Sequence, residues 1–140
     1  MNFYENNYIN PSDIVQINDN IIANDYMCKH CNKIKLSMYV IDRLSELKNA
    51  LNTDIYVIQG YMCENLCFDN NDNINNSHTL GVAADISFGG KFDLIDIFDV
   101  LVSKFPQIGI IKSITNEYYV HLQYSDKCLY WLCDKNENDN

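Results

Sequence analysis

The sequence predicts a small α+β domain built on a mainly antiparallel β-sheet with flanking helices. Segments with apolar residues at helical spacing mix with short segments rich in β-branched and aromatic residues, without the regular strand–helix–strand rhythm of a parallel sheet. With 140 residues, 47% of them hydrophobic, the chain can fill one core. We therefore expect a single domain over residues 1–140, with its core at about 26–133.

Two segments carry the apolar period of an amphipathic helix. In residues 37–51, Ser37 is a favourable N-cap, and the apolar stripe consists of Val40, Leu44, Leu47 and Leu51. In residues 93–105, apolar side chains again share one face, and the following Pro106 ends the segment. We predict a helix in each segment.

Four short segments are predicted to be strands: 54–61, 83–88, 107–114 and 118–124. The first is interpreted as a buried strand that stops near Gly60. In the last, strict alternation places His121 on the face opposite Val120 and Leu122. Residues 63–76 are rich in Asn and Asp and predict a loop, while the polar first ten and last seven residues predict frayed ends.

The charge of the chain excludes some classes of partner. A formal net charge of −9 would repel a phosphate backbone or an anionic lipid surface, so neither nucleic acid nor membrane is an expected partner. No apolar run approaches the roughly 20 residues that span a bilayer, and the N-terminus lacks the pattern of an export signal. We expect a protein that is cytoplasmic as synthesised. No pattern predicts its oligomeric state.

The six cysteines are expected to be reduced thiols, since no export signal points to an oxidising compartment. Cys28 and Cys31 have the spacing of a zinc knuckle, which Cys128 and Cys133 could complete as a four-thiolate site. Buried core thiols are the alternative, and His30 is not assigned as a zinc ligand.

A candidate catalytic metal site lies in the string Ser77-His78-Thr79-Leu80-Gly81-Val82-Ala83-Ala84-Asp85. A catalytic zinc ion keeps three protein ligands and one open position, and His78, Asp85 and His121 supply that number. Gly81 allows a tight turn after the first histidine, so that the carboxylate can point back toward it. The pattern predicts one catalytic Zn²⁺.

This string, followed by a Val-His strand, closely resembles the family of zinc D-Ala-D-Ala carboxypeptidases and L-alanyl-D-glutamate endopeptidases, which have a Hedgehog-like fold. The likeness extends from the early cysteine segment through a strand ending in Gly-Tyr to His121, about residues 26–124. The resemblance implies that His78, Asp85 and His121 are the zinc ligands. It also implies that the substrate is a peptidoglycan-type peptide containing D-amino acids, as for a phage-type endolysin.

The resemblance implies hydrolysis by a metal-activated water, which requires a general base. Relatives place an acid three residues, or a histidine two residues, before the last ligand, where this chain has Tyr118 and Tyr119. Glu117 is the candidate base, although four residues of straight strand span roughly 13 Å, so it requires a bend or bulge. Ser77 and Tyr119 are the candidates for contacting substrate or oxyanion.

Two other positions depart from the family. Met62 stands where relatives have an arginine, and Gln123 replaces an aspartate two residues after the last ligand. Lys91 or Lys112 could supply the missing positive charge, whereas Arg43 lies on a predicted helix and suits a surface salt bridge. Two alternatives to a peptidoglycan peptidase therefore remain. The first is a non-catalytic zinc-binding module that binds cell wall or peptide, and the second is a cytoplasmic D,D-dipeptidase.

Overall fold

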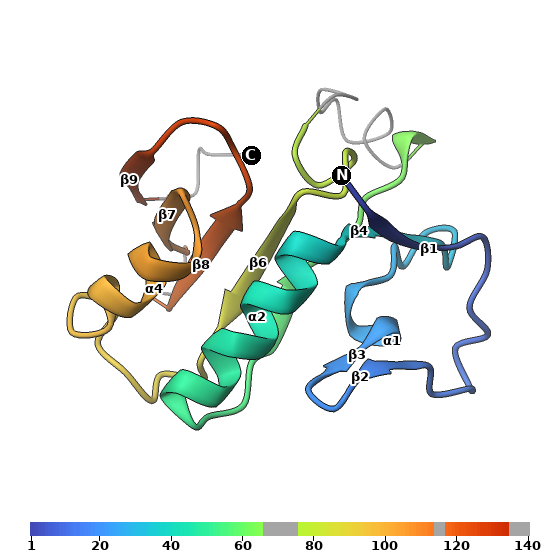
Figure 1. The fold of residues 1–140 in the computed structure, drawn as a ribbon, viewed down its shortest axis with the longest axis horizontal. Coiled ribbons are helices and arrows are strands. Elements are labelled where there is room, and N and C mark those ends of the chain that lie inside the picture. Colours follow the sequence, from blue (N-terminus) through green and yellow to red (C-terminus); the bar gives the residue numbers. More distant parts are fainter. Residues whose placement is uncertain (66–75, 114–116, 135–140) are drawn as a thin grey trace.

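The computed structural model describes residues 1–65, 76–113 and 117–134 (Figure 1). Most of the loop predicted at 63–76 and the last six of the seven residues predicted to be frayed at the C-terminus lie outside these described residues. Within them, helices and strands are mixed in one α+β arrangement, which confirms the predicted class. The helices α2 (Met38–Leu51) and α4 (Phe98–Lys104) contact each other.

The largest sheet has five strands in the order β5-β6-β8-β7-β9. Their bounds are β5 Tyr56–Gln59, β6 Ala83–Ser87, β7 Gln107–Lys112, β8 Tyr118–Gln123 and β9 Leu129–Asp134. Neighbours pair antiparallel except for β7 and β9, which run parallel. The mainly antiparallel sheet and four of its strands were therefore predicted correctly, whereas β9 was not predicted.

The strand predicted at 54–61 forms, but the prediction that it is buried was wrong. β5 is an edge strand, and its Tyr56 and Ile58 side chains are 55% and 51% exposed. β-branched and aromatic content does not distinguish an edge strand from a central one, because both favour the same extended backbone.

Helix α2 (Met38–Leu51) begins and ends as its sequence predicts. The Ser37 hydroxyl accepts a hydrogen bond from the Tyr39 N–H at 3.1 Å, and Asn52 ends the helix in the left-handed conformation with φ 46°. The buried face consists of Val40, Ile41, Leu44 and Leu47. This pattern confirms the helix expected at 37–51.

Helix α4 (Phe98–Lys104) is shorter than the helix expected at 93–105. Asp93 accepts hydrogen bonds from the Ile95 N–H with its side chain, at 3.2 Å, and from the Asp96 N–H with its carbonyl, at 3.0 Å. These local bonds form turns that compete with the helix, so the first five residues of the predicted segment are not helical. Leu94 and Ile97 are nevertheless buried.

The N-terminal third forms two small sheets and a short helix. β1 (Phe3–Asn6) pairs antiparallel with β4 (Ile34–Ser37), and β2 (Gln16–Asn18) pairs with β3 (Ile21–Ile22), which leads into α1 (Ala23–Tyr26). The prediction that the first ten residues are frayed was wrong. Their backbone pairs with β4, and Ile9 is only 1% exposed.

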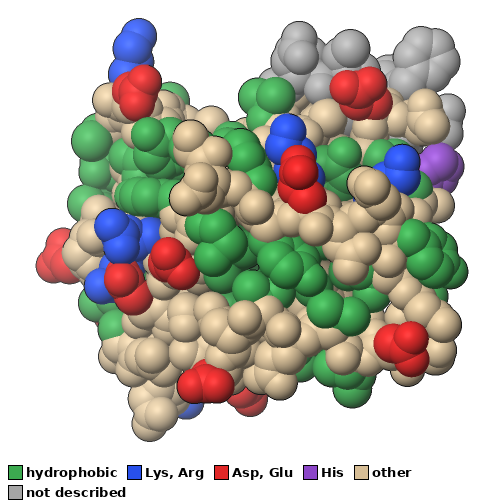
Figure 2. All heavy atoms as spheres, turned by 45° about the vertical axis from the view of Figure 1, so that its right-hand side comes forward, with side chains coloured by type: hydrophobic (Ala, Val, Ile, Leu, Met, Phe, Trp, Pro, Cys, Tyr) green, Lys and Arg blue, Asp and Glu red, His purple; other side chains and the backbone are tan. Residues whose placement is uncertain are grey.

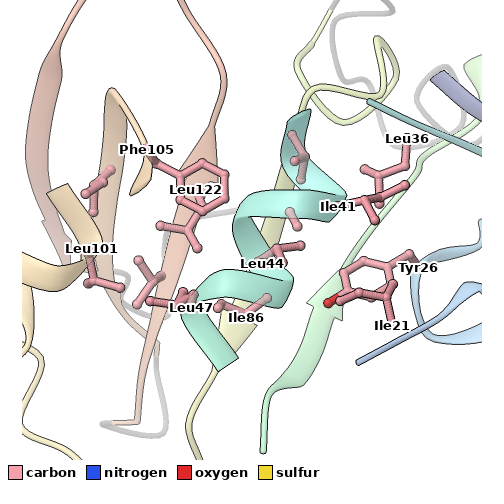
Figure 3. Packing of buried hydrophobic residues seen from close by; sticks show 14 of the residues in the cluster. Ile21, Tyr26, Leu36, Ile41, Leu44, Leu47, Ile86, Leu101, Phe105 and Leu122 are labelled. Carbon is pink, nitrogen blue, oxygen red and sulfur yellow. The ribbon is translucent and has the colours of Figure 1, made fainter. Parts of the chain in front are cut away.

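Helix α2 lies at the centre of the hydrophobic core (Figure 3). Ile21, Tyr26 and Leu36 from the N-terminal third pack on one side of it, and Leu101, Phe105 and Leu122 lie on the other. On the central strands, the residues that face this core alternate with residues that face away. The face of the sheet turned away from α2 is therefore the one available for a site.

The surface in Figure 2 mixes acidic and basic side chains with apolar and uncharged ones. In the part of the chain that the structure describes, no helix has the length and apolar character needed to cross a bilayer.

Candidate metal centre

His78, Asp85 and His121, here called the histidine–aspartate cluster, come together in the structure. One donor atom from each lies within 4.8 Å of the other two. Asp85 in β6 is directly opposite His121 in β8 in the antiparallel register, so their side chains share one face of the sheet. The side chains are only 12–14% exposed. The ligand set predicted from the sequence is thus assembled at one point.

A tight turn positions His78 in the cluster. The Gly81 N–H donates to the His78 carbonyl at 3.2 Å, and the Val82 N–H donates to the Ser77 carbonyl at 3.0 Å. Gly81 has φ +75°, and a Cβ there would lie 2.6 Å from the Lys35 carbonyl oxygen, so glycine is required. The turn leads directly into β6, which carries Asp85.

Both imidazoles are oriented by a second hydrogen bond. Nδ1 of His78 lies 3.0 Å from the Gly60 carbonyl oxygen, so it must carry the proton, and Nε2 faces Asp85 Oδ2 at 3.2 Å. In His121 the roles are reversed, because Nε2 lies 2.9 Å from Gln123 Oε1 and Nδ1 lies 2.7 Å from Asp85 Oδ1. Gln123 therefore preserves a supporting hydrogen bond.

These distances suit a zinc ion. With zinc–nitrogen and zinc–oxygen bonds of about 2.0–2.1 Å, neighbouring ligand atoms in a tetrahedron are about 3.3 Å apart. The two distances between imidazole nitrogen and carboxylate oxygen are 2.7 and 3.2 Å, so small side-chain movements would open the required space. The hydrogen-bond partners on Gly60 and Gln123 keep the other nitrogen of each imidazole directed toward Asp85.

The charge of the cluster at neutral pH favours the binding of a cation. Burial alone would raise the pKa of Asp85, but hydrogen bonds from His121 and His78 lower it to about 2. Burial lowers the pKa of His121, while its hydrogen bond and charge interaction with Asp85 outweigh this and raise it. The carboxylate is thus ionised at neutral pH and attracts positive charge, whether a proton on His121 or a metal ion.

Trp131 also belongs to the site, although the sequence did not indicate it. Gly109 in β7 is opposite both His121 and Trp131 of the adjacent strands. A Cβ on Gly109 would lie 2.5 Å from the indole, so the missing side chain leaves room for the ring. The Trp131 and His121 ring centroids are 5.6 Å apart. Trp131 therefore forms an apolar wall beside His121.

The other candidate site residues have different positions. Tyr119 is half-buried and shares the face of His121, two residues along β8. Ser77 is half-buried in the turn, whose Thr79 N–H is capped by the Asn76 side chain at 3.0 Å. Glu117 is exposed and precedes β8, and the register of Tyr118–Gln123 with β7 is regular, without a bulge. The described strand thus supplies no bend that would bring Glu117 to the cluster, and only a measured rate can decide whether it is the base.

The positively charged candidates are distributed over other surfaces. Arg43 forms the expected salt bridge, with Glu46 at 3.1 Å, and Lys112 lies 5.9 Å from the Tyr118 ring. Met62, where the resemblance of the motif leads one to expect an arginine, lies beside the turn, because its N–H donates to the His78 carbonyl at 3.4 Å.

Lys91 borders a separate hollow of about 470 Å³ near the C-terminal end of α2. The lining residues are Asn20, Lys48, Asn49, Asn52, Thr53, Asp54, Tyr56, Phe88, Gly89 and Lys91. None of these belongs to the histidine–aspartate cluster.

Three cysteines form a second group that could hold a metal ion: Cys28, Cys31 and Cys63, here called the cysteine cluster. Cys128 and Cys133, which the sequence offered as partners of the first two, are exposed. Cys63 takes their place. The spacing of the cysteines along the sequence could not predict this, because Cys63 reaches the other two only through the position of the segment that follows β5. Cys67 lies outside the described residues.

Comparison of the chain with protein-family models, with curated proteins and with solved structures finds no match. The function must therefore be inferred from the site and from the motif that forms it.

Proposed function

We propose that the protein is a zinc-dependent peptidase that hydrolyses peptidoglycan-type peptides containing D-amino acids. The observation that supports this most directly is the histidine–aspartate cluster, which offers three ligand atoms on the sheet face away from α2. The resemblance of the motif to zinc D-Ala-D-Ala carboxypeptidases and L-alanyl-D-glutamate endopeptidases supplies the substrate class. A Hedgehog-like fold and an endolysin role belong to the same proposal.

Zinc bound to the cluster would polarise the scissile carbonyl and make a water acidic enough to attack it at neutral pH. The chain's own residues would fix this chemistry in place. Asp85 supplies negative charge, and Gly60 and Gln123 hold the two imidazoles in the tautomers that direct a lone pair inward. Tyr119, on the same face as His121, would donate a hydrogen bond to the developing oxyanion.

The test is to incubate the zinc-loaded protein with muropeptides and with D-Ala-D-Ala and to identify new amine termini by mass spectrometry. We expect the wild type to cleave a muropeptide and His121→Ala to lose this activity. Arg43→Ala is the matched control, because it removes only the exposed pair with Glu46 and should keep the wild-type rate. Zinc-loaded wild type that cleaves neither substrate would refute the proposal, and cleavage of D-Ala-D-Ala alone would favour a D,D-dipeptidase.

A zinc-binding module without catalysis is the second candidate. It is favoured by Met62 at the arginine position and by the exposure of Glu117, which precedes the regularly paired strand β8. This candidate predicts that the zinc-loaded protein binds muropeptides and leaves them intact. Calorimetric titration followed by mass analysis of the same sample separates it from the peptidase.

A further inference from the structure

The cysteine cluster has the geometry of a metal site rather than of packed thiols. One sulfur from each of Cys28, Cys31 and Cys63 lies within 4.8 Å of the others. In a tetrahedral zinc site with bonds of about 2.3 Å, neighbouring sulfurs are about 3.8 Å apart. Cys28 and Cys63 are 0% and 7% exposed, so the space between the sulfurs is screened from water. The three sulfurs are thus arranged as ligands around one point.

Backbone N–H groups surround the Cys28 sulfur. It accepts a hydrogen bond from the Cys63 N–H at 3.5 Å, and the N–H groups of Cys31 and His30 lie close to it. A neutral thiol is a weak acceptor, whereas a thiolate is stabilised by converging N–H groups. The backbone is therefore arranged for a negatively charged sulfur.

The loop from Cys28 to Lys33 holds this arrangement. The Asn32 N–H donates to the Cys28 carbonyl at 2.8 Å, and the Cys28 N–H donates to the Lys33 carbonyl at 2.8 Å. Asn32 has φ 58°, which turns the chain so that the Lys33 N–H lies close to the Cys31 sulfur. The Cys-x-x-Cys spacing and this turn together present two sulfurs to one ion.

His30 brings a fourth donor atom to the cluster. Its Nδ1 lies 3.4 Å from the Cys63 sulfur, and the residue is otherwise exposed, so its imidazole can rotate without disturbing the core. The sequence gave no reason to assign His30 a ligand role, because the position of Cys63 was unknown. Three thiolates and one imidazole in a tetrahedron are a ligand set that selects Zn²⁺.

We propose that the cysteine cluster, with His30 as fourth ligand, binds a structural Zn²⁺ that is separate from the histidine–aspartate cluster. This ion fastens the loop after α1 to the segment that follows β5. The same segment packs on Tyr26, since the Tyr61 N–H donates to the Tyr26 carbonyl at 2.8 Å, and its Gly60 carbonyl orients His78. The structural ion thereby stabilises the position of a ligand of the other site.

The experiment measures metal content and cobalt spectra of the full chain, purified under reducing conditions. We expect two zinc ions per chain in the wild type and one each in His121→Ala and Cys31→Ser. Cobalt in wild type and in His121→Ala should give the near-ultraviolet charge-transfer absorption of thiolate ligands, and Cys31→Ser should lose it. Cys133→Ser is the matched control, because Cys133 is exposed and outside the cluster, and it should change nothing.

X-ray absorption of zinc-loaded His121→Ala keeps the test decisive if Cys31→Ser fails to fold. Three sulfur ligands at about 2.3 Å and one nitrogen at about 2.0–2.1 Å are expected. Four sulfur ligands would overturn the assignment of His30. Equal zinc content in the wild type and in Cys31→Ser, or cobalt-loaded wild type without thiolate absorption, would overturn the site itself.

Discussion

Gly60→Ala tests how tightly the segment after β5 is held. A Cβ on Gly60 would lie 2.3 Å from the Tyr26 carbonyl oxygen, 2.5 Å from its Cα and 2.7 Å from its carbonyl carbon. All three are backbone atoms, which cannot rotate away. Since ordinary contacts begin near 3.4 Å, the two segments must separate by about 1 Å.

That separation breaks two hydrogen bonds described above, from the Tyr61 N–H to Tyr26 and from His78 to the Gly60 carbonyl. Overpacking costs about 1–3 kcal/mol, and each partly buried polar group left unpaired costs about 1–3 kcal/mol. We therefore expect the free energy of unfolding to fall by about 3 kcal/mol or more, a large part of the 5–15 kcal/mol typical of a domain. Loss of the hydrogen bond to His78 should also weaken zinc binding by about 10–100-fold.

Urea unfolding followed by the fluorescence of the single tryptophan measures the first effect, and chelator competition measures the second. Gly90→Ala is the control. No atom lies within 4 Å of its Cβ position, and its φ of +74° costs only about 1–2 kcal/mol of local strain. If Gly60→Ala is no less stable than Gly90→Ala and binds zinc equally well, the inferred contact with Tyr26 is wrong.

Three further predictions concern the site. In metal-free protein, the ionised carboxylate of Asp85 should contribute about 2 kcal/mol to the free energy of unfolding above its unfolded pKa of 3.8, and this contribution is lost as pH falls through about 2. The contribution of protonated His121 is complete at low pH and is lost as pH rises through its raised pKa. Urea unfolding against pH measures this, and a stability difference between wild type and Asp85→Asn that stays constant from pH 2 to pH 5 would contradict it. Gly109→Ala should cost about 1–3 kcal/mol in the wild type but less in Trp131→Ala, because the indole occupies the position of the new methyl group. A double-mutant cycle measures the coupling, and additive effects would exclude the contact. Glu117→Gln should leave the hydrolytic rate nearly unchanged, because the regular register of β8 keeps the exposed Glu117 away from His121. A loss of about 100-fold or more would show that Glu117 acts as the base.

Features whose cause is local in the chain were predicted from the sequence. Ser37 and the apolar stripe after it specify α2, because the cap and the helix period act within a few residues. The residues of the histidine–aspartate cluster were predicted for a similar reason. The turn at Gly81 and the alternation of β8 fix which way His78 and His121 point.

Features that depend on distant pairing were missed. The first strand lies in an asparagine-rich segment and gains its order from β4, and Ile9 is buried although its neighbours in sequence are not. Trp131 enters the site only because β9 joins β7 opposite Gly109. These pairing partners are distant in the sequence, so no local pattern of residues could predict them.

The spacing of the ligands along the chain means that each cluster forms only after distant segments have met. Cys28 and Cys63 are separated by 35 positions, and Asp85 and His121 are separated by 36 positions and meet only when β6 and β8 have paired. Closing two loops of nearly equal length costs nearly the same chain entropy, so metal occupancy of either cluster requires long-range structure. Occupancy of the histidine–aspartate cluster would therefore signal that β6 and β8 have paired, and metal release from it would report opening of the sheet.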